Sequence, residues 1–200
     1  MRILIACEFS GIVRDAFIAR GHDAVSCDLL PSERPGPHLQ RNVLDVLHQL
    51  DWDAMIAFPP CTYLCSSGLH WNRRVPGREA LTDDAVEFVR QLLSAPIQRI
   101  ALENPIGCLS TRIRRPDQII QPWQFGHDAS KATCLWLKRL PPLVPTRVLP
   151  GGRAARRANQ TASGQNKLGP SASRGKDRSR TYQGIADAMA SQWMRQEDQT

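Results

Sequence analysis

The stretch AMIAFPPCTYLCSSG, residues 54–68, decides how the first half of the chain folds. Its first five residues form an apolar run, which indicates a buried strand of a parallel sheet. Pro59 and Pro60 follow, and because neither can donate a hydrogen bond to a neighbouring strand, the strand ends before them. The prolines also restrict the backbone around them. Cys61 therefore leaves the strand in a constrained geometry, at the edge of the sheet where parallel sheets bind ligands.

A thiol in this position has three interpretations. It is a nucleophile where its surroundings lower its pKa, and in most proteins it is a small buried apolar side chain. Cys61 and Cys65 also form a CxxxC pair that resembles half of a metal site. The sequence has no second Cys/His pair at zinc spacing, so we expect no metal site.

Strand and helix patterns alternate along the chain, which is typical of an α/β fold with right-handed crossovers. Thr82 or Asp83 is the expected N-cap of the most amphipathic helix. The sequence therefore predicts an α/β fold with a mostly parallel sheet. The patterns predict strands at 2–7, 22–29, 52–58, 98–104 and 132–138, a short turn or helix at 42–47, and helices at 11–21, 83–95 and 181–196.

The carboxyl ends of parallel strands meet at one edge of a sheet, so four loops come together there. They contain residues 7–11, Asp28, residues 59–65 and residues 103–107. Glu103 in the last loop ends an apolar strand. A single carboxylate there is most simply a structural cap, but close to a thiol held by prolines it is a candidate acid or base.

Positive charge is concentrated in one part of the 200-residue chain, whose net charge is +7. Residues 139–180 hold ten of the 26 Lys and Arg residues but only one of the 19 Asp and Glu residues. Such a segment indicates a polyanionic partner, most simply nucleic acid, or else a solubilising loop.

Composition divides the chain into three parts. We expect a catalytic core at residues 1–139, a basic Pro/Gly/Ser-rich and mobile segment at 140–180, and a C-terminal helix at 181–200 that returns to the core. No apolar stretch reaches the roughly 18 residues of a membrane span, and the N-terminus lacks a signal-peptide pattern. We therefore expect a cytoplasmic protein with reduced cysteines and no membrane partner.

The loops around Cys61 and Glu103 resemble motifs of the DNA cytosine-C5 methyltransferases. PPC at 59–61 is similar to the Pro-Cys nucleophile loop of that family, and ENP at 103–105 is similar to its Glu-Asn-Val loop. Across its length the chain resembles small methyltransferase-like proteins of phages and prophages. The further matching stretches are CEFSGIVRDAF (7–17), SCDLL (26–30), NVLDVL (42–47), QPWQFGH…KATCLWLK…LPPLVPT (121–146) and RSRTYQGIADAMASQW (178–193).

The resemblance implies a Rossmann-like S-adenosylmethionine-dependent methyltransferase fold without the family's large target-recognition domain. It implies that Cys61 and Glu103 are catalytic. The chain departs from the family at Arg14, which stands where the family has a small residue. The implied cofactor contacts are Phe9, Ser10, Gly11, Asp28, Asp45 and Pro59. The implied substrate contacts are Pro60, Asn104, Arg153, Arg156 and Arg157, together with Gln124, His127 and Lys131 in place of the family's base-holding arginine.

The function implied by these motifs is methyl transfer from S-adenosylmethionine to C5 of cytosine in DNA, through a covalent adduct of Cys61. The target base would be flipped out or single-stranded, and the protein would act as a monomer. One alternative is a catalytically degenerate protein of the same fold that binds nucleic acid or S-adenosylmethionine without turnover. Another is a transferase for free nucleotides, which the missing recognition domain favours and the basic segment disfavours.

Overall fold

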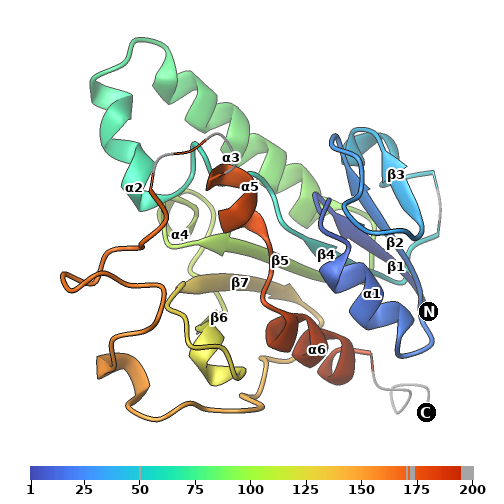
Figure 1. Ribbon diagram of the computed structural model, residues 1–200. Helices are drawn as coiled ribbons and strands as arrows, with labels where there is room; N and C mark the ends of the chain where they lie inside the picture. The colour runs from blue at the N-terminus through green and yellow to red at the C-terminus, as the bar shows by residue number, and fades with distance from the viewer. Residues whose placement is uncertain (50, 170, 172–173, 195–200) are drawn as a thin grey trace.

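The structure, a computed structural model, describes residues 1–49, 51–169, 171 and 174–194, and in these residues it has a seven-stranded sheet with the order β3-β2-β1-β4-β5-β7-β6 (Figure 1). The five strands from β3 to β5 are parallel, whereas β7 runs antiparallel to both β5 and β6. The predicted α/β fold with a mostly parallel sheet is thus confirmed. The strands are β1 (Arg2–Ala6), β2 (Asp23–Asp28), β3 (His38–Gln40), β4 (Ala54–Ala57), β5 (Arg99–Pro105), β6 (Gln118–Ile120) and β7 (Thr133–Lys138).

Helices cover both faces of the sheet. In Figure 1, α1 (Ile12–Ile18) and α6 (Gln183–Gln192) lie on one face, and α3 (Arg78–Ser94) lies on the other. Successive residues of β1 alternate between the two sides: Ile3 packs in the cluster that contains residues of α1 and α6, and Leu4 packs in the cluster that contains residues of α3. Because β1 and β4 lie in the middle of the sheet and are buried on both faces, residues 3–6 and 54–57 are uninterrupted apolar runs.

The predicted start of α3 is wrong. The helix begins at Arg78, after Gly77 with φ 77°, so Thr82 and Asp83 lie inside it. Thr82 is buried, and its hydroxyl donates to the Tyr63 carbonyl at 3.1 Å and accepts from Asn72 at 2.9 Å. Its role is to hold the loop after β4, which a local capping pattern does not reveal.

Short elements fill the connections. The α-helical ones are α2 (Ser66–Leu69), α4 (Leu109–Arg112) and α5 (Arg174–Ser179). The 3-10 helices are η1 (Val43–Asp45), η2 (His70–Arg73), η3 (Pro122–Gln124) and η4 (Gly152–Ala154). The predicted short turn or helix at 42–47 corresponds to η1, and the predicted C-terminal helix corresponds to α6; its proposed continuation over 195–200 lies outside the described residues.

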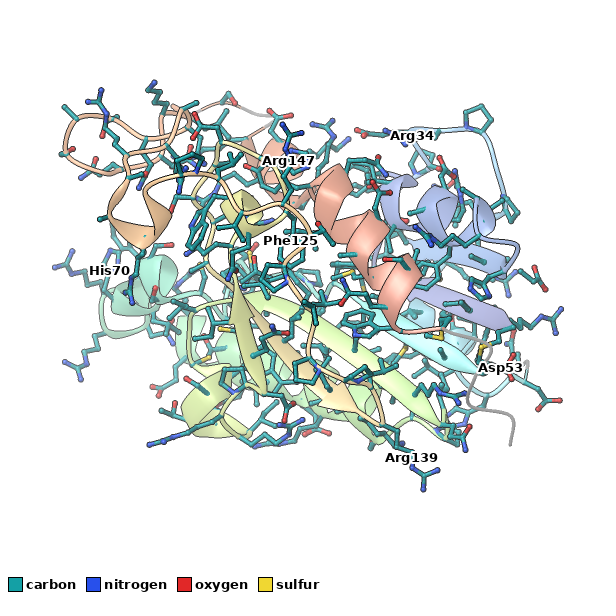
Figure 2. The ribbon with its side chains drawn as sticks, turned by 90° about the horizontal axis from the view of Figure 1, so that it is seen from below. Arg34, Asp53, His70, Phe125, Arg139 and Arg147 are labelled. Carbon is teal, nitrogen blue, oxygen red and sulfur yellow. The ribbon has the colours of Figure 1, made fainter. Side chains whose placement is uncertain are left out.

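The described part of residues 140–180 packs on the body at several points. Trp193 of the C-terminal segment donates to the Pro141 carbonyl at 2.8 Å. Phe125 forms an isolated bridge with Arg147. Figure 2 shows Phe125 among interior side chains, whereas Arg139 projects at the outer edge. The basic segment begins after β7 and includes α5 near its end.

Within the described ranges, no helix is both long enough and apolar enough to cross a bilayer.

Candidate active site

The loops that follow β4 and β5 are bound to each other. The Asn104 side chain is buried and donates to the Pro59 carbonyl at 2.9 Å. The Cys108 backbone N–H donates to the Leu64 carbonyl at 2.9 Å. Gly107 is required at this contact, because a Cβ there would lie 1.9 Å from the Leu64 oxygen. The two loops therefore hold one fixed relative position.

Cys61 and Glu103 border the same cavity, at the carboxyl ends of β1, β4 and β5. The cavity has about 510 Å³ of empty space, including the part open to solvent. The strand order reverses between β1 and β4, which is where open α/β sheets bind ligands. The other sequence-predicted residues on its wall are Phe9, Ser10, Pro59, Pro60 and Lys131.

Asp28 borders a second cavity, of about 970 Å³ on the same measure, which shares Cys7 and Pro60 with the first. Asp28 accepts a hydrogen bond from the Leu30 backbone at 2.9 Å, and burial raises its pKa. The remaining wall is largely apolar and includes Val43, Tyr63, Leu81 and Phe88. A carboxylate accepts hydrogen bonds from ribose hydroxyls, and apolar walls pack on an adenine ring, so this lining suits a nucleoside. Asp45 lies at the end of η1 and is exposed.

The turn from β1 into α1 is built around Glu8. Cys7 has φ 57° and Gly11 has φ 72°, so the backbone passes twice through the left-handed region. Glu8 is 5% exposed, and its Oε1 accepts from Ser10 Oγ at 2.8 Å and from the Val13 backbone at 2.9 Å. Burial raises the pKa of Glu8. Sequence reasoning missed this residue, although a Glu directly after a buried strand was the available signal.

Arg14 faces the loop after β2. Its fully buried guanidinium donates to Ser32 Oγ at 3.0 Å and to the Pro35 carbonyl at 2.9 Å, and it lies 2.8 Å from Asp15. Gly36 packs on it so closely that a Cβ would lie 2.7 Å from Arg14 Cζ. The arginine therefore organises this loop instead of crowding a ligand at the sheet edge.

Cys61 and Cys65 act as a pair. The Cys65 backbone N–H donates to the Cys61 carbonyl at 3.0 Å, one helical turn away, so the two thiols are neighbours. Interaction between the thiols raises the pKa of Cys61 and lowers the pKa of Cys65 to about 5. Burial raises the Cys61 pKa further, whereas the Lys131 ammonium lowers it. Of the two thiols, Cys65 is therefore the one that forms a thiolate more readily.

Gln124 and His127 make packing contacts away from Cys61. Gln124 Oε1 accepts from the Gln121 backbone at 2.7 Å. His127 Nε2 accepts from the Gly184 backbone at 2.8 Å, and burial lowers the pKa of His127, which keeps the ring neutral. Of the three residues expected to replace the base-holding arginine, the structure places Lys131 on the cavity wall.

The three predicted arginines of the basic segment differ in exposure. Arg157 is 5% exposed, donates to the Gly152 carbonyl at 2.6 Å and lies 5.2 Å from the centre of the Trp123 ring. Arg153 and Arg156 are exposed. All three border a polar hollow next to η4, separate from the cavity of Cys61.

Residues 178–180, at the end of α5 and directly after it, line the cavity; α5 is labelled in Figure 1. Arg180 donates two hydrogen bonds to the Glu33 carboxylate, at 2.7 and 2.9 Å, and one to Asp177 at 2.6 Å. The Lys176 ammonium lies 5.9 Å from the centre of the Phe9 ring. Arg178 borders the cavity itself. Sequence reasoning did not place these side chains at the site, because Glu33, the partner of Arg180, is 147 residues away along the chain.

Among the residues that the structure describes, no group of three or more His, Cys, Asp and Glu side chains is placed to hold a metal ion.

Comparison with known proteins finds a distant structural similarity and no family. No protein family matches the chain, and no curated protein matches it. A solved structure of a candidate DNA modification methyltransferase, encoded within a prophage of E. coli, is similar at 14% identity and a TM-score of 0.44. The similarity covers 75% of this chain and 52% of that protein, so the chain spans about half the length of the structure it matches. The functional conclusion therefore depends on the chemistry of the site.

Proposed function

We propose that the protein transfers a methyl group from S-adenosylmethionine to C5 of cytosine in DNA, through a covalent adduct of Cys61. The observation that carries this proposal is that Cys61 and Glu103 border one cavity at the point where the strand order reverses. A parallel sheet with one reversed strand near its edge also supports a Rossmann-like methyltransferase fold.

The cofactor would occupy the two neighbouring cavities, which share Cys7 and Pro60. In the larger one, Asp28 would hold the ribose hydroxyls and the apolar wall of Val43, Leu81 and Phe88 would hold the adenine ring, with Asp45 near its edge. In the smaller one, the turn at Phe9, Ser10 and Gly11 and the Pro59 segment would hold the remainder of the cofactor. Bound S-adenosylmethionine would supply an electrophilic methyl group.

The protein would make C5 reactive. C5 of cytosine is a weak nucleophile, so Cys61 first loses its proton, for which the Cys65 thiolate is the neighbouring acceptor. The Cys61 sulfur then bonds to C6 while Glu103 holds a proton at N3, and electron density moves to C5. After methylation a base removes the C5 proton, the bond from sulfur to C6 breaks, and the aromatic ring is restored.

The basic segment would bind the DNA backbone. The target base must leave the stack to present C6 to Cys61, at a cost of a few kcal/mol. Exposed Arg153 and Arg156 would contact phosphates and offset that cost, with Arg157 supporting them from beneath. Lys131 and Pro60 would contact the substrate within the cavity, and Asn104 would hold the loop of Cys61 through the Pro59 carbonyl. Gln124 and His127 would contribute only through their packing contacts outside the cavity.

DNA that contains 5-fluorocytosine tests the proposal. In the presence of S-adenosylmethionine the fluorine at C5 cannot leave as a proton does, so the enzyme remains bonded to the base. We expect an adduct that survives denaturing electrophoresis and maps to Cys61 by mass spectrometry. Cys61→Ser should give no adduct and keep nearly normal cofactor binding. Normal methylation by Cys61→Ser would refute the proposal.

A second candidate is a protein of the same fold that binds DNA or S-adenosylmethionine without turnover. The raised pKa of Cys61 favours it, because a protonated thiol is a poor nucleophile. Normal binding of DNA and cofactor without any adduct or methylation would select this candidate.

A further inference from the structure

Glu8 has one carboxylate oxygen that the protein leaves without a partner. The side chain is 5% exposed and borders the cavity of Cys61 and Glu103. Oε1 accepts two hydrogen bonds, from Ser10 Oγ and from the Val13 backbone. Oε2 is buried, and no described residue donates a hydrogen bond to it.

A buried carboxylate oxygen without a partner is unfavourable unless a ligand supplies one. The Arg14 guanidinium does not reach Oε2, because it donates to Asp15, to Ser32 and to carbonyls of the loop after β2. On the open side of the cavity, Arg180 is held by Glu33 and Asp177. The inner end of the cavity, whose wall also includes Lys131 and Arg178, therefore presents a buried carboxyl oxygen without a hydrogen-bond donor among the described residues.

We propose that Glu8 binds a cationic group of the ligand, either the sulfonium or the α-ammonium group of S-adenosylmethionine. The inference rests on the proposed function and adds a residue to the cofactor site. The positive charge of the cofactor would compensate the buried carboxylate, and an ammonium group would also donate to Oε2. Asp28 does not serve this purpose, since it borders the other cavity, where the ribose would lie.

The test measures binding by calorimetry with three ligands: S-adenosylmethionine, S-adenosylhomocysteine and deaminated S-adenosylhomocysteine. The first two differ in the charge on sulfur, and the last two differ in the α-amino group. Glu8→Gln retains an acceptor for Ser10 and Val13 and replaces the charged oxygen with an amide. The matched control is Glu87→Gln on the exposed surface of α3.

In the wild-type protein, recognition of the sulfonium predicts at least about tenfold tighter binding of S-adenosylmethionine than of S-adenosylhomocysteine. Recognition of the ammonium predicts a similar preference for S-adenosylhomocysteine over its deaminated form. Glu8→Gln should reduce the affected ratio to nearly one, whereas Glu87→Gln should leave it unchanged.

The inference is overturned if the wild-type protein shows neither preference, or if folded Glu8→Gln retains both ratios. Circular dichroism verifies the fold of the variant. If Glu8→Gln does not fold, the wild-type ratios decide: one preference supports the inference, and the lack of both overturns it. Failure of the wild-type protein to bind any of the ligands would refute the proposed function itself, which is a distinguishable result.

Discussion

Asn104 links the two loops of the site, because its side-chain amide donates to the Pro59 carbonyl at 2.9 Å. Asn104 directly follows Glu103, and Pro59 stands two residues before Cys61. The bond joins the ends of β4 and β5 and so fixes the position of the thiol relative to the carboxylate. It is buried, since Asn104 is 1% exposed.

Asn104→Leu should therefore impair both stability and chemistry. Loss of the donor leaves the Pro59 carbonyl unsatisfied, which costs about 1–3 kcal/mol of unfolding free energy. We expect a lower midpoint in urea and slower adduct formation on 5-fluorocytosine DNA. An unchanged rate in the folded variant would show that the position of Cys61 does not depend on this bond.

The paired thiols predict which cysteine reacts first with an alkylating agent. Because the pKa of Cys65 is lowered to about 5, its thiolate forms as the pH rises through that value and is complete by neutral pH. Peptide mapping after limited iodoacetamide treatment at pH 7 should find the label on Cys65 before Cys61.

Cys65→Ala should reverse part of this pattern. Without the Cys65 thiolate the pKa of Cys61 falls towards its ordinary value, so Cys61 alkylation should increase at pH 8 to 9. Cys108→Ala, a change at the neighbouring free thiol, is the comparison. Equal labelling of Cys61 in both variants would mean that the two thiols do not share a proton.

The ion pair of Arg180 with Glu33 predicts that α5 can be released without unfolding the core. Both side chains are more than one-third exposed, so Glu33→Gln should cost less than about 1 kcal/mol. Trypsin should nonetheless cut the segment around Arg178 faster. Glu87→Gln, which breaks a surface pair with Arg90, should leave the cleavage rate at that segment unchanged. Equal rates in both variants would show that the pair does not hold α5.

The exposure of the basic segment predicts two kinds of arginine variant. Arg153→Ala with Arg156→Ala should weaken DNA binding and reduce the slope of log affinity against log salt by roughly 0.9 per lost phosphate contact. Arg157→Ala should mainly lower thermal stability, since Arg157 is buried against Trp123. A salt slope unchanged in the double variant would mean that the exposed arginines are only solvated.

Local patterns were enough to predict most of the sheet. Strands buried on both faces are largely apolar, and residues 3–6 of β1, all of β4 and residues 100–102 of β5 form such runs. The strands β3 and β6 were missed because three residues are too few for a recognisable period. The start of α3 was misplaced because Thr82 uses its hydroxyl in tertiary contacts.

The sequence by itself determined the α/β order and placed Cys61 and Glu103 at strand ends, because apolar periodicity and proline act within a few residues. Only the tertiary structure decided that the two border one cavity and that Cys65 has the lower pKa of the paired thiols. It also decided that Glu8 has an unpartnered oxygen and that Arg180, at the cavity, pairs with Glu33. Burial and ion pairing depend on groups brought together from distant parts of the chain, and a linear pattern does not record those distances.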